Sequence, residues 1–158
     1  MEKVISIAIA GLLMIFPVAA QAAGTAEDVD YSQKVSTALP NFQKAIVDWG
    51  ALATKQPSLT IDPKYKSWKA KFIASSNAVI KTAKILDGLK GTQGFTKSDP
   101  LLHAAMASYI KGTQKMISAV NKNSTKGMND SGAAFASAGK NLLAWQTAYQ
   151  ADVAELNK

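Results

Sequence analysis

The 158-residue chain contains no cysteine and no arginine, and it has a single histidine, His103. Without cysteine there can be no disulfide, no thiolate metal site, no iron–sulfur cluster and no covalently attached c-type haem. Without arginine the chain lacks the planar side chain that most often reads guanine edges and phosphates. These absences exclude several classes of metalloprotein, and we expect no specific nucleic-acid partner.

The usual catalytic constellations are missing as well. Beyond residue 22 the only glutamates are Glu27 and Glu155, so a di-iron carboxylate site with paired Glu-x-x-His motifs cannot be built. There is no Gly-x-Ser-x-Gly turn, and the glycines between Gly88 and Gly94 match neither standard phosphate-binding spacing. We therefore expect that the protein is not an enzyme.

The first residues are typical of a secretory signal peptide. A short charged start is followed by the apolar run Val4–Phe16, whose 13 residues are fewer than the roughly 20 that span a bilayer. Ala20-Gln21-Ala22 fits the small-x-small cleavage rule. We expect residues 1–22 to be cleaved, leaving one helical-bundle domain, residues 23–158, with no transmembrane segment. The expected location is the periplasm or the exterior of the cell.

All 18 basic residues are lysine, and the formal net charge is +7. A lysine-rich surface favours solubility and loose contact with an anionic envelope surface. The lysines have two interpretations: an ordinary solvated surface, or a surface that binds anionic envelope polymers. Charge runs are usually solvated faces, so the binding of polymers is the weaker interpretation.

Helical periodicity begins in the first part of this domain. Apolar residues alternate at spacings of three and four along Val35–Ala53, which predicts a helix with one buried stripe. Thr25 or Asp28 can cap its start, and Pro57 should follow its end. Pro40 lies inside the pattern, so we expect this helix to be kinked or broken there.

Two later helices share an Asp-Pro start signal, at Asp62 and at Asp99, which places an N-cap residue before a proline in the first turn. A fourth helix should start near Asn129 or Asp130. The corresponding apolar stripes are Tyr65–Leu86, Leu102–Val120 and Phe135–Leu156. Four helices with short connections predict an all-α fold, an antiparallel up-down-up-down four-helix bundle.

In that topology one end of the bundle collects the start of helix 1, the end of helix 2, the start of helix 3 and the end of helix 4. The aromatic residues on the helical stripes have two interpretations. The first is that they simply fill the core. The alternative is that they line an apolar cavity that binds a ligand between the helices. The candidate ligand-binding cluster at this end consists of Tyr31, His103, Met106, Tyr109, Trp145 and Tyr149.

His103 is also the candidate ligand for a haem or a metal ion. Met106 is on the same helix and cannot approach a haem iron from the opposite face. Met116 lies 13 residues farther along that helix, roughly 20 Å away, and Met128 is expected at the other end of the bundle, so this topology excludes His/Met ligation within one monomer. Haem b held by His103 alone, or shared across a dimer, stays an alternative. Asp99 and His103 could hold copper or zinc, but two ligands make a weak site and Asp99 is expected to cap its helix. No cofactor is predicted, and the helix N-terminus should favour a neutral imidazole.

These observations favour a non-enzymatic exported helical bundle that binds a partner protein or an apolar small molecule, or that has an envelope structural role. A haem- or metal-binding periplasmic protein centred on His103 is the alternative. The third and weaker possibility is lysine-mediated attraction to anionic polymers.

Overall fold

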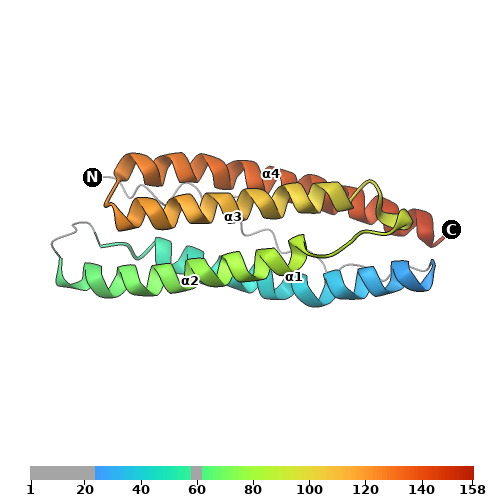
Figure 1. Cartoon of the computed structure of the whole chain (residues 1–158), viewed down its shortest axis with the longest axis horizontal. Coiled ribbons are helices and arrows are strands. Elements are labelled where there is room, and N and C mark those ends of the chain that lie inside the picture. The colour runs from blue at the N-terminus through green and yellow to red at the C-terminus, as the bar shows by residue number, and fades with distance from the viewer. Residues whose placement is uncertain (1–23, 58–61) are drawn as a thin grey trace.

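The computed structural model describes residues 24–57 and 62–158, and these residues form an all-helical bundle without a strand. The bundle has four long helices, and Figure 1 shows them lying side by side along one axis, which confirms the predicted fold class. The predicted signal peptide lies outside the described residues. The elements are α1 (Ala26–Ala53), α2 (Pro63–Asp87), the short 3-10 helix η1 (Gln93–Phe95), α3 (Asp99–Asn121) and α4 (Thr125–Leu156).

Helices that follow one another in the chain pack against one another. α1 packs on α2, α2 on α3, and α3 on α4, whereas α1 and α4 are bridged mainly by side chains rather than by close approach of their backbones. The bridges include a 2.8 Å hydrogen bond between the hydroxyls of Ser32 and Tyr149. They also include the rings of Trp49 and Phe135, whose centres are 4.7 Å apart. The seam between α1 and α4 is therefore the widest of the four around the bundle.

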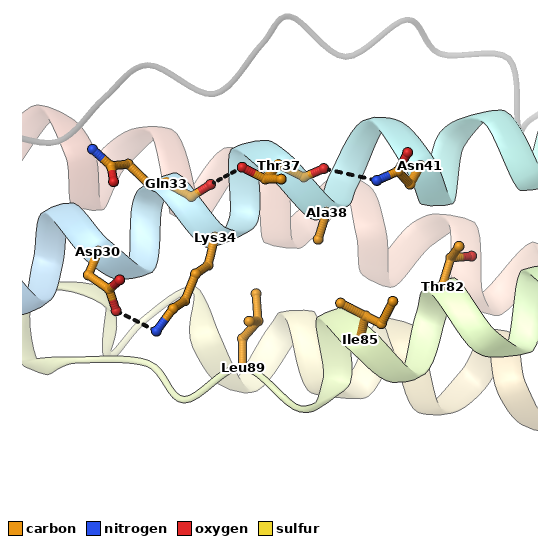
Figure 2. Close-up of a pocket in the computed structure, with 9 residues that line it drawn as sticks. All are labelled: Asp30, Gln33, Lys34, Thr37, Ala38, Asn41, Thr82, Ile85 and Leu89. Carbon is orange, nitrogen blue, oxygen red and sulfur yellow. Dashed lines mark hydrogen bonds and ion pairs between the residues drawn. The ribbon is translucent and has the colours of Figure 1, made fainter.

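Pro40 does not divide the first helix. α1 runs from Ala26 to Ala53 through it, so the helix is not broken there, whereas the alternative expectation of a kink stays a prediction. Pro40 is exposed, and its ring is accommodated on the solvent face. Side chains bond carbonyls of the same stretch: Thr37 Oγ1 donates to the Gln33 carbonyl at 2.9 Å, and Asn41 Nδ2 donates to the Thr37 carbonyl at 3.2 Å (Figure 2). These bonds lie in the stretch in which proline removes one backbone donor, and side-chain bonds of this kind are typical of places where a helix bends.

Two helix starts differ from the prediction. The N-cap of α3 is Ser98, not Asp99, so the Asp99 carboxylate is not used as a cap. α4 begins at Thr125, four residues before Asn129, because Ser124 accepts a 3.1 Å bond from the backbone N–H of Gly127. A Cβ on Gly127 would lie 2.9 Å from the Ala119 Cβ, so glycine allows the first turn of α4 to approach α3.

The core is filled by aromatic rings that contact one another. Trp49 is fully buried, and its ring packs on Phe72 with centres 5.4 Å apart. The Trp49 Nε1–H donates to the hydroxyl of buried Ser76 at 2.9 Å, and that hydroxyl donates to the Phe72 carbonyl at 2.8 Å. A serine therefore occupies a core position of α2 because the indole needs a buried acceptor.

Candidate functional site

The connection between α2 and α3 closes one end of the bundle. Phe95, in η1, is fully buried, with its ring centre 4.7 Å from that of Tyr31 and 5.1 Å from that of Tyr149. Trp145 extends this row, at 5.4 Å from Tyr149. Three of the six predicted cluster residues, Tyr31, Tyr149 and Trp145, thus belong to one row of rings that includes Phe95, a residue outside the predicted helical stripes.

Met106 and Tyr109 lie in the same core, and neither is exposed. The Tyr109 ring packs edge-on against Phe42, with centres 5.1 Å apart. Burial raises the pKa of both the Tyr109 and the Tyr31 phenols, so both remain hydrogen-bond donors at neutral pH. All five cluster residues other than His103 are therefore buried core side chains.

Asp28 ties the first turn of α1 to the α2–α3 connection. Its carboxylate accepts from the backbone N–H of Thr25 at 2.9 Å, from the Thr25 hydroxyl at 2.7 Å and from the Thr92 hydroxyl. The backbone N–H of Gly94 also donates to it, at 3.3 Å. The hydrogen bonds from Thr92 and Thr25 hold the pKa of the Asp28 carboxyl below its ordinary value.

His103 lies half-buried on the flank of this closed end, between two carboxylates. Its Nδ1 is 3.1 Å from Asp87 Oδ1, and its Nε2 is 3.4 Å from Asp99 Oδ2. Asp99 also accepts a 3.0 Å hydrogen bond from the Tyr31 hydroxyl. A neutral imidazole can donate to only one of these carboxylates, whereas an imidazolium can donate to both. The expectation of a neutral ring rests on the helix N-terminus alone and stays a prediction.

The two predicted metal ligands, Asp99 and His103, are thus neighbours. Within residues 24–57 and 62–158, however, no group of three or more His, Asp or Glu is placed to hold a metal ion. Asp87 lies at the other ring nitrogen, so the two carboxylates flank the imidazole rather than converge with it on one point. This geometry joins the ends of α2 and α3, and it offers one ion at most two protein ligands.

Tyr31, Asp99, His103 and Asp87 form a network of polar contacts, the Asp99–His103 network. Gly91, which packs on Asp99, is the position at which this network can be tested. A Cβ there would lie 2.3 Å from the Asp99 Cγ. We expect Gly91→Ala to displace Asp99, break its bond with Tyr31 and lower the free energy of unfolding by about 1–3 kcal/mol. Urea denaturation measures this loss. Gly139→Ala, whose new methyl would meet nothing nearer than 4.0 Å, should instead leave stability unchanged or slightly higher. Equal losses in both variants would contradict the packing of Asp99 on Gly91.

A surface groove runs between α1 and α2 and continues past the end of α2. The part between α1 and the last turns of α2 has a volume of about 400 Å³. The part beyond the end of α2, at the end of the bundle, has a volume of about 530 Å³. Both parts are lined by Asp30, Lys34 and Leu89, so they are continuous. Tyr31 and Gly91 line the end part, which places it beside the Asp99–His103 network.

The groove has an apolar floor and a polar rim. Figure 2 shows Ala38, Ile85 and Leu89 pointing into the space between the two helices, with Lys34 and Asp30 bonded to each other at its edge. Ile85 is 52% exposed, the highest value among the large apolar side chains of the described residues. Sequence reasoning missed this groove because most of its lining residues are polar and fall on the faces assigned to solvent. The only signal in the sequence was Ile85, an apolar residue that lies next to the stripe position Leu86.

Comparison with known proteins provides no family for this chain: no family model, no curated protein and no solved structure matches it. Among the described helices, none is long and apolar enough to cross a membrane.

Proposed function

We propose that the protein is a non-enzymatic binding protein that holds a small amphipathic molecule in the α1–α2 groove. The observation that carries this proposal is the apolar floor of Ala38, Ile85 and Leu89 inside a continuous groove. Each part of the groove falls within the range of roughly 300–1,000 Å³ that is typical of small-molecule sites. An exported location, in the periplasm or outside the cell, is part of the same proposal.

The chemistry of the groove defines the ligand class. The apolar floor favours an aliphatic or aromatic body, because its burial removes apolar surface from water. The end part is lined by Lys34 and Lys90 and also by the acidic residues Glu27 and Asp30, and Lys34 is bonded to Asp30. It therefore offers both hydrogen-bond donors and acceptors to a polar end group. The ligand we expect therefore has an apolar body of modest size and one polar end.

The anilinonaphthalene sulfonate dye (ANS) is a suitable probe, since it combines an apolar ring system with one sulfonate. We expect saturable ANS fluorescence with the native protein and at least about tenfold weaker binding in Ile85→Lys, which places a charge on the groove floor. Val47→Lys is the matched control, because Val47 is 48% exposed on α1 and lines neither part of the groove. Equal ANS affinity in both variants would sink the proposal.

A haem or metal centre at His103 remains the alternative, and the position of Asp87 and Asp99 on opposite sides of the ring does not favour it. Titration with haem separates the two. A Soret shift that disappears in His103→Ala would support the haem centre over the groove proposal.

A further inference from the structure

Four buried polar atoms have no hydrogen-bond partner among the described residues. They are Ser36 Oγ and Gln43 Nε2 of α1, Tyr109 OH of α3 and Trp145 Nε1 of α4. Tyr109 and Trp145 are themselves 0% and 1% exposed. Buried polar groups are nearly always hydrogen-bonded in native proteins, so a set of four calls for an explanation.

The register between α1 and α4 places these atoms at two levels of the bundle, which are about two helical turns apart. Three contacts set this antiparallel register: Gly24 near Leu156, Ser32 bonded to Tyr149, and Trp49 packed on Phe135. Ser36 is one turn beyond Ser32, and Trp145 is one turn before Tyr149, so both lie at one level. Gln43 lies at the level of Gly139 by the same alignment.

Tyr109 reaches this second level from α3. Its ring contacts Phe42, the neighbour of Gln43, and its hydroxyl is the nearest atom, at 4.0 Å, to the position of a Cβ on Gly139. The lack of a side chain at Gly139 therefore leaves room for a methyl-sized group beside the hydroxyl. This level also lies in the α1–α4 seam, where the backbones are farther apart than elsewhere.

We infer that the α1–α4 seam is a second binding site, for a neutral, largely apolar molecule with carbonyl-type acceptor oxygens. The indole N–H of Trp145 and the amide of Gln43 are donors, and the buried phenol of Tyr109 stays protonated and can donate as well. The surrounding rings of Phe42 and Phe135 favour a flat apolar body. An anion is disfavoured because these neighbours carry no charge to compensate it.

The probe is 2,3-dimethyl-1,4-naphthoquinone, which is flat, neutral, carries two carbonyl oxygens and quenches nearby tryptophan. We expect saturable quenching of tryptophan fluorescence by the probe. Tyr109→Phe should bind about fivefold more weakly, the effect of one hydrogen bond, with an unchanged or higher Tm. Gly139→Leu should bind at least about tenfold more weakly, because its side chain occupies the space beside the hydroxyl.

Tyr65→Phe is the matched control, because the Tyr65 hydroxyl already has a partner, Asn123 Oδ1 at 2.9 Å. It should lower the Tm slightly and leave the affinity for the quinone unchanged. Unsaturable quenching, or equal affinity in Tyr109→Phe and Tyr65→Phe, would overturn the inference. So would a fall in Tm for Tyr109→Phe as large as that of the control, since it would show that the hydroxyl is already bonded.

Discussion

Phe95→Ala should lower the free energy of unfolding by about 3–5 kcal/mol, the range for removing a fully buried phenylalanine. Phe95 is 0% exposed and fills the space between Tyr31 and Tyr149. The same change should loosen the α2–α3 connection, because this ring is its only buried apolar anchor. Urea denaturation followed by circular dichroism measures the loss.

Phe95→Leu is the control for shape, and it should cost less because most of the apolar volume is retained. A loss below about 1 kcal/mol in Phe95→Ala would show that the connection is not docked on the bundle.

Asp28→Asn should lower the free energy of unfolding by about 1–3 kcal/mol at pH 7, because it replaces a charged acceptor of hydrogen bonds from Thr25, Thr92 and Gly94. The carboxyl pKa is lowered in the folded protein, so its contribution is present above the unfolded value of about 4. That contribution is lost as the pH falls through the folded value. The penalty of the substitution should therefore shrink when unfolding is measured at pH 3.

Asp48→Asn is the matched control for this pH dependence. Asp48 also accepts a hydrogen bond, from Lys44 at 2.6 Å, but its side chain is 56% exposed. Exposed pairs of this kind contribute little, so the control should change stability only slightly at either pH. A penalty for Asp28→Asn that is the same at pH 3 and pH 7 would contradict the role of its charge.

The helices could be predicted from the sequence because their signals are local. Thr25 and Asp28 form the predicted cap of α1 together, as a capping box, and Asp62 caps α2 through a 2.8 Å bond with the Lys64 N–H. Asp99 carries the same Asp-Pro signal but has another role. The N-cap of α3 is Ser98 instead. The Ser98 N–H donates to the buried carboxylate of Asp152 in α4 at 3.0 Å, and no local sequence pattern contains this contact.

The candidate sites depend on contacts between helices, and the sequence gives few signals of these. The partner of His103 that the sequence missed, Asp87, is on a different helix, so the spacing along α3 could not show it. Phe95 lies outside every helical stripe, so no periodicity marked it as buried. The groove between α1 and α2 is a shape formed by two faces that each look solvent-exposed, and only their packing makes it concave.

Two-dimensional NMR of the ¹⁵N-labelled protein tests most directly whether the α1–α2 groove is the binding surface. Addition of ANS should shift the backbone signals of Ala38, Ile85 and Leu89 together, with one saturation curve. The signals of Val47 and Leu143, which are exposed apolar residues outside the groove, should not move. Shifts at Val47 and Leu143 with none at Ile85 and Leu89 would contradict the proposed function.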